Sequence, residues 1–240
     1  MTYLRLFFLF IHVAISSTLA LIFTLVDRSH KLYFILTKVY SLPVLWIAGI
    51  KVKVIGKENF DHKTPYVFVA NHLSIFDMPV LQHYVPNDFG FVFKKEILRI
   101  PIFGLQMYLG PGIVIDRQNP EKALKSIEKA KKMLVKRKVS VLLFPEGTRS
   151  KTGEMLPFKR GAFRIASQVG FSIVPVTISG TQKLIQKKPF KLKPGFVKLE
   201  FGKPIPALNV NSRKDELELM AKVRDIIEGN FKKETELGYS

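Results

Sequence analysis

Residues 66–77 read YVFVANHLSIFD, an apolar run of β-branched and aromatic residues that passes directly into polar ones. A second stretch of the same design reads VSVLLFPEGTRS at residues 139–150. Each predicts a buried strand followed by a polar segment. Because open α/β sheets bind their ligands at the carboxyl ends of strands, we expect the two polar segments to lie at one functional edge.

The pattern around these stretches predicts the fold class. Short β-rich runs alternate with helical patterns after residue 50, which indicates an α/β domain with a mainly parallel central sheet flanked by helices. The clearest helix has Asn119 as its N-cap and Pro120 at its first position. We expect helices at residues 75–84, 120–137, 161–169 and 214–231, and strands at residues 51–55, 66–70, 89–93, 113–115, 139–144, 172–178 and 196–201.

The first fifty residues have a different composition. Leu6 to Val26 contains no charged residue over 21 positions, and as a helix of about 31 Å it is long enough to cross a bilayer core. The second apolar stretch, Leu32 to Ile50, contains Lys38 and Pro43 and makes a poor independent span. We therefore divide the chain into a two-helix membrane-binding motif at residues 1–50 and an α/β domain at residues 51–240. We favour two helices embedded in one leaflet, and the alternatives are a hairpin that crosses the bilayer and a core helix of a soluble protein.

The charge of the chain also indicates its partners. Lys and Arg number 38 against 19 Asp and Glu, a formal net charge of +19, although the mean hydropathy is +0.14. Such an excess implies nucleic acid, an anionic membrane surface or a phosphorylated substrate. Nucleic acid is disfavoured because aromatic and basic residues do not interleave as in a stacking platform. With no cysteine, the chain has neither disulfides nor thiolate metal sites.

Two residues of the first polar segment could perform acid–base chemistry. If a helix begins after Ser74, Asp77 falls in its first turn and can reach back to His72, which would fix one tautomer of a general base. The same Ser74-x-x-Asp77 spacing is also that of a capping box, which would explain both residues without catalysis.

The second polar segment suits the recognition of a phosphate. Gly147 permits unusual backbone angles, Arg149 offers a planar fork of donors, and Thr148 and Ser150 supply hydroxyls. A polar turn after a strand is an equally good explanation of these residues.

Taken together, the segments resemble a known family. Asn71-His72-x4-Asp77 followed about 70 residues later by FPEGTRS (residues 144–150) is similar to the glycerolipid acyltransferases, in particular the bacterial-type 1-acyl-glycerol-3-phosphate acyltransferases. Three further blocks match in order: GIVIDR (112–117), FKRGA (158–162) and IVPV (173–176). The resemblance covers residues 50–205.

This resemblance implies an activity. An acyl chain would pass directly from acyl carrier protein or coenzyme A, as co-substrate and without another cofactor, to the sn-2 hydroxyl of lysophosphatidic acid, forming phosphatidic acid. His72 would be the general base and Asp77 its orienting partner, with backbone N–H groups near Ser74 meeting the oxyanion. Ser74 as a nucleophile is the alternative. The place of action would be the inner (cytoplasmic) membrane, with the catalytic domain on the cytoplasmic face among anionic lipids.

The resemblance also implies a substrate site without a metal. Arg149 would bind the phosphate, and Glu146 would pair with an arginine or accept from the glycerol. The expected substrate-binding residues are Lys94, Arg117, Glu146, Gly147, Thr148 and Arg149. The apolar residues 97–109 would line an acyl channel or face lipid, and packing beneath the sheet is the alternative.

Two other functions fit part of the pattern. A non-catalytic module that binds anionic lipid would explain the charge, but it gives no reason for His72, Asp77 and the 146–149 loop to follow strands. An acyltransferase for another acceptor, such as glycerol-3-phosphate or another lysolipid, would use the same dyad.

Overall fold

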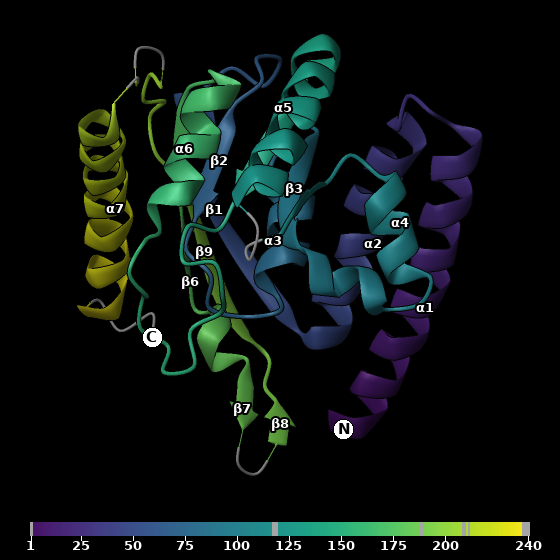
Figure 1. Ribbon diagram of the computed structural model, residues 1–240. Helices are drawn as coiled ribbons and strands as arrows, with labels where there is room; N and C mark the ends of the chain where they lie inside the picture. Colours follow the sequence, from purple (N-terminus) through teal and green to yellow (C-terminus); the bar gives the residue numbers. More distant parts are fainter. Residues whose placement is uncertain (1, 117–119, 188–189, 208–209, 211, 237–240) are drawn as a thin grey trace.

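The computed structural model describes residues 2–116, 120–187, 190–207, 210 and 212–236. A seven-stranded sheet forms its centre, in the order β1-β9-β6-β2-β5-β3-β4, and every neighbouring pair is parallel except β6 and β9. The expectation of a mainly parallel sheet flanked by helices is confirmed (Figure 1). The strands of this sheet are β1 Ile50–Ile55, β2 Val67–Ala70, β3 Phe89–Lys94, β4 Ile113–Ile115, β5 Ser140–Leu143, β6 Ile173–Ser179 and β9 Gly195–Phe201.

Helices cover both faces of the sheet because the strands are apolar on both sides. In β2, Val67 and Val69 join one buried cluster with α5, α6 and α7, whereas Phe68 and Ala70 join the other with α2 and α3. This burial of both faces explains the near-continuous apolar runs in the sequence. The helices are α1 Thr2–Val26, α2 Lys31–Ala48, α3 Asp77–Tyr84, α4 Phe103–Leu109, α5 Pro120–Arg137, α6 Arg160–Val169 and α7 Arg213–Glu236, with short 3-10 turns η1 Lys57–Asn59, η2 Lys95–Arg99 and η3 Thr181–Lys183.

The strand order places the two polar segments side by side. Strand β2 pairs in parallel with β5, so their carboxyl ends meet at one edge of the sheet. Strand β9 runs antiparallel to β6, and β1 follows β9, so the amino ends of β1 and β9 reach this same edge. We call it the carboxyl edge.

The two apolar helices at the N-terminus form an antiparallel hairpin beside the sheet (Figure 1). Both are long and apolar enough to cross a membrane by length and composition, but α2 is one-third buried against the rest of the protein. Its buried side chains belong to the same clusters as the strands, including Phe34 and Leu45. The outward faces of α1 and α2 expose large apolar side chains, among them Phe7, Phe10 and Trp46.

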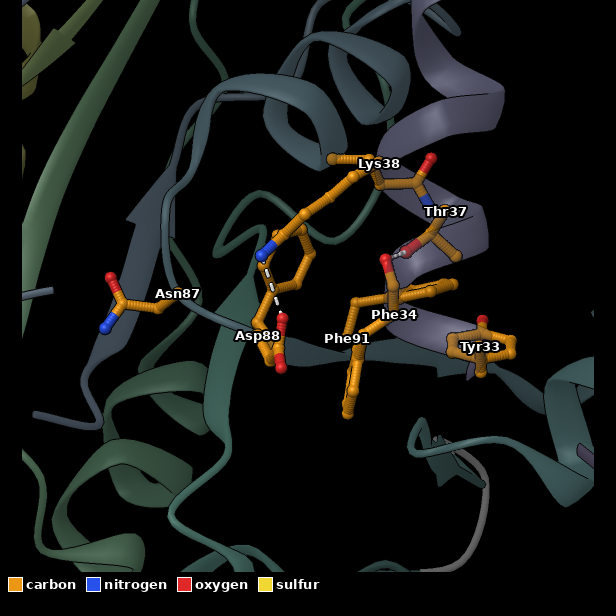
Figure 2. A pocket seen from close by; sticks show the side chains of 9 residues that line it. Tyr33, Phe34, Thr37, Lys38, Asn87, Asp88 and Phe91 are labelled. Carbon is orange, nitrogen blue, oxygen red and sulfur yellow. Dashed lines mark hydrogen bonds and ion pairs between the residues drawn. The ribbon is translucent and has the colours of Figure 1, made fainter. Parts of the chain in front are cut away.

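Lys38 of α2 does not face lipid. Its Nζ donates to the carbonyl oxygen of Pro86 at 3.0 Å and to Oδ1 of Asp88 at 2.9 Å, beside a small pocket that Tyr33 and Phe91 help to line (Figure 2). The lysine that interrupts the second apolar stretch therefore joins α2 to the loop before β3.

Two elements differ from the sequence expectations. Residues 103–109 form the short helix α4, which packs against α1. A two-stranded hairpin, β7 Ile185–Lys187 and β8 Phe190–Leu192, follows β6. Each strand has only three residues, which is too short for the alternation of Phe190, Lys191 and Leu192 to stand out as a strand pattern.

Candidate active site

The end of β2 is fixed before the site begins. Asn71 is fully buried, and its side chain exchanges two hydrogen bonds of 2.8 Å with the backbone N–H and C=O of Ile178 in β6. This clamp sets where the chain leaves the sheet, and therefore where His72 stands at the carboxyl edge.

His72 and Asp77 form the pair that their spacing allowed and the family resemblance implied. Nδ1 of His72 lies 2.8 Å from Oδ2 of Asp77, and the side chains are 17% and 0% exposed. The carboxylate can only accept here, so the hydrogen bond assigns the proton to Nδ1 and leaves Nε2 as the basic nitrogen. The imidazole also stacks on the ring of Phe144, with centroids 4.0 Å apart and an interplanar angle of 17°. Packing and hydrogen bonding together hold the ring in one orientation.

Four donors surround the Asp77 carboxylate. Besides the imidazole, Oδ2 accepts from the backbone N–H groups of Leu73 at 2.7 Å and Ser74 at 2.8 Å. Oδ1 accepts from the hydroxyl of Thr181 at 2.6 Å, and Thr181 is fully buried. The Asp77 carboxylate is thus buried and fully hydrogen-bonded, whereas part of the His72 side chain stays accessible to solvent.

The hydrogen bonds at the start of α3 bear on two expectations. The carboxylate of Asp77 reaches back to the N–H of Ser74 as in a capping box, but the Ser74 hydroxyl accepts from Phe76 at 3.4 Å, so only half of the box is present. The backbone N–H groups of Leu73 and Ser74 already donate to Asp77. These two groups are therefore not available to an oxyanion, and the expected oxyanion donors near Ser74 stay a prediction.

Glu146 connects the two polar segments. It is 1% exposed, and its carboxylate accepts from the backbone N–H of His72 at 2.7 Å and of Leu156 at 2.9 Å. Burial raises the pKa of this carboxyl, and the two hydrogen bonds oppose that rise. Of the two partners expected from the sequence, an arginine or the glycerol, the backbone donors of His72 and Leu156 take the place of the arginine, and a contact with the glycerol stays a prediction. Glu146 therefore fixes the loop after β5 to the residue that carries the imidazole.

The loop after Glu146 carries the expected phosphate ligands to the surface. Gly147 has φ 72°, a left-handed conformation that an L side chain rarely adopts. Thr148 and Arg149 are exposed, and the described part of the chain gives the guanidinium of Arg149 no ion-pair partner. Both side chains are accessible from solvent at the carboxyl edge.

The other two expected cations lie further along this edge. Lys94 is the last residue of β3, which neighbours β5, and its side chain is half-buried. Arg117 follows β4 and lies outside the described residues. A phosphate site shared by Arg149, Lys94 and Arg117 stays a prediction.

The apolar segment 97–109 packs partly on itself and leaves part of its apolar surface exposed. A Cβ on Gly104 would lie 2.5 Å from the carbonyl oxygen of Leu98, so this glycine packs against the preceding turn. The segment also exposes large apolar side chains: Ile100, Ile102, Leu105 and Tyr108. Their exposure beside α1 favours the lipid-facing alternative.

Two contacts that support the dyad had no sequence signal. Thr181 is 104 positions from Asp77, and nothing local marks it as the donor to that carboxylate. Phe144 belongs to the second polar stretch, but its stacking on His72 depends on the pairing of β2 with β5.

The Acyltransferase family model matches residues 51–179, which include the dyad and the 144–150 loop. The chain belongs to this acyltransferase family.

Individual relatives make the likeness more specific. The 1-acyl-sn-glycerol-3-phosphate acyltransferase of Saccharomyces cerevisiae is 35% identical over 220 residues, 90% of this chain and 71% of the relative. That of Cocos nucifera is 36% identical over 162 residues, 68% of this chain and only 52% of the relative. The crystal structure of the 1-acyl-sn-glycerophosphate (LPA) acyltransferase from Thermotoga maritima shares the fold, with TM-score 0.78 and 24% identity over 97% of this chain and 95% of that one.

Proposed function

We propose that this protein transfers an acyl chain from an acyl thioester to the sn-2 hydroxyl of 1-acyl-glycerol-3-phosphate, forming phosphatidic acid. The observation that carries the proposal is the His72–Asp77 pair at 2.8 Å, held at the carboxyl edge and open on the imidazole side. The relatives that share the acyltransferase family with this chain carry that activity in their names.

The geometry supports a direct transfer. An alcohol is a weak nucleophile, so Nε2 of His72 removes the hydroxyl proton as the oxygen attacks the thioester carbonyl. The Asp77 carboxylate stabilises the resulting imidazolium and keeps the ring in place. When the tetrahedral intermediate collapses, the C–S bond breaks and the thiolate takes the proton back from the imidazolium. Ser74 is a poor alternative nucleophile, since it is 6% exposed.

The surroundings of the dyad support an anionic, membrane-bound acceptor. The exposed guanidinium of Arg149 offers a planar fork to a phosphate, and the apolar faces of α1, α2 and α4 offer a surface to the acyl chains. Because one face of α2 packs on the α/β domain, the two helices fit a place in one leaflet better than a hairpin that crosses the bilayer. We place the protein at the inner membrane, with this edge on the cytoplasmic side.

Replacing His72 by alanine tests the mechanism. We expect acyl transfer to fall by about 100- to 10,000-fold, the range that a general base contributes. His62→Ala is the matched control, because His62 is exposed and its imidazole contacts the Lys57 carbonyl and the Phe60 ring rather than the dyad. Thiol release from acyl carrier protein and coenzyme A thioesters, with lysophosphatidic acid, glycerol-3-phosphate and other lysolipids, identifies donor and acceptor. Near-normal turnover by His72→Ala would rule out the proposed base.

A further inference from the structure

The β7–β8 hairpin is a separate feature of the carboxyl edge. It follows η3, pairs Ile185 with Leu192, and is closed by a hydrogen bond of 2.8 Å from the Lys193 N–H to the Leu184 carbonyl. In Figure 1 it projects beyond the main sheet, at the end of the molecule where α1 begins. Its root is anchored by Thr181, the residue that donates to Asp77.

The hairpin is strongly basic. Residues 181–199 contain six lysines and neither Asp nor Glu. The side chains of Lys183, Lys191 and Lys193 are exposed, and within the described residues none of the three forms an ion pair. Charges left exposed in this way suit a surface of opposite sign rather than the stability of the fold.

Apolar and aromatic groups border these lysines. Gly49 ends α2, and a Cβ there would lie 2.9 Å from Pro194, which places the end of α2 against the end of the hairpin. Near this junction Trp46 is 81% exposed and Phe196 is 70% exposed. Exposed tryptophan beside lysine is typical of residues that sit at the headgroup level of a membrane.

We infer that the β7–β8 hairpin is a docking surface for an anionic phospholipid bilayer. Lys183, Lys191 and Lys193 contact the headgroups while the adjoining ends of α1 and α2 insert their apolar side chains, and the carboxyl edge with His72 is held at the surface. An acidic soluble protein would satisfy the charge but not the exposed Trp46, Phe196 and helix faces next to it. That this docking brings His72 to its lipid substrate rests on the proposed function.

The test measures vesicle binding by the full-length chain, without substrates. Vesicles of phosphatidylcholine alone are compared with vesicles containing phosphatidylglycerol in a sedimentation assay. The hairpin variant replaces Lys183, Lys191 and Lys193 by glutamine. The matched control makes the same three replacements in α5, at the exposed Lys131, Lys132 and Lys136, which lie in the half of the helix that leads away from the carboxyl edge.

We expect the hairpin variant to bind phosphatidylglycerol vesicles on the order of 100-fold more weakly, about fivefold for each lysine at the surface. The α5 variant should bind within a few-fold of the unmodified protein, and neither variant should change binding to neutral vesicles. Equal weakening by both variants would mean that net charge alone acts, and no weakening by the hairpin variant would mean that another partner occupies the surface. Either result overturns the inference. An inactive enzyme that still shows the expected vesicle pattern would refute only the proposed function.

Discussion

The buried hydroxyl of Thr181 supports the dyad from behind, so its removal tests how Asp77 is held without changing a residue that contacts substrate. Thr181→Val keeps the branched shape but removes the donor 2.6 Å from Oδ1 of Asp77, where both residues are fully buried. A buried acceptor left without its donor costs about 1–3 kcal/mol, and more when it is charged. For a domain of this size each kcal/mol lowers the melting temperature by about 2–4 °C. We expect the variant to melt roughly 5 °C lower, or more.

The effect on catalysis follows from the remaining contacts. Complete loss of the carboxylate behind a catalytic histidine costs about 10,000-fold in a protease. Thr181→Val leaves three of the four donors to Asp77 in place, so we expect kcat to fall by about tenfold, equivalent to about 1.4 kcal/mol. Because Thr181 acts through Asp77, KM for acceptor and donor should not change.

Two variants separate positioning from a general loss of stability. Thr181→Ser returns the hydroxyl and should restore most of kcat. In an Asp77→Asn background, Thr181→Val should have no further effect on kcat, because the pathway through the carboxylate has already been removed. Steady-state kinetics and thermal unfolding in detergent measure both. Wild-type kcat in Thr181→Val, or an equal loss in Thr181→Ser, would refute the role assigned to this hydroxyl.

Three further predictions concern the rest of the fold. Gly104→Ala should lower the free energy of unfolding by about 1–3 kcal/mol, because the new Cβ would lie 2.5 Å from the Leu98 carbonyl oxygen. Gly161→Ala is the control and should be neutral or stabilising, because the space around Gly161 is open. Thermal unfolding that ranks the two variants the other way would contradict this packing. Glu146→Gln places an NH2 group against one of the two backbone N–H donors, those of His72 and Leu156. We expect the free energy of unfolding to fall by about 1–3 kcal/mol and kcat to fall strongly. Unchanged kinetics would show that the loop does not need this hydrogen bond. Hydrogen bonds, of which the one from the Ser29 hydroxyl has the largest effect, lower the pKa of the Asp27 carboxyl from 3.8 to about 2. The stability that this carboxylate adds to the fold is therefore fully present above pH 3.8 and is lost as the pH falls through about 2. An NMR titration of Asp27 with a midpoint at the ordinary value would contradict this.

Much of the site was readable from sequence because its key contact is local. His72 and Asp77 are five residues apart, so a strand followed by a helix was enough to bring the carboxylate back to the imidazole. The alternation of apolar strands with amphipathic helices likewise predicted the sheet and the shared edge of β2 and β5. These features follow from backbone periodicity and spacing, which the sequence contains in full.

The remaining features depend on which strands became neighbours. The sheet order alone brings Thr181 to Asp77, Phe144 to the face of the imidazole, and Glu146 to the backbone of His72. The same order sets the lysine hairpin beside the end of α2. Contacts between residues far apart in the chain are set by packing, for which local propensity has no signal. The sequence determined the class of fold and the dyad, and the tertiary structure decided how the dyad is held and which surface surrounds it.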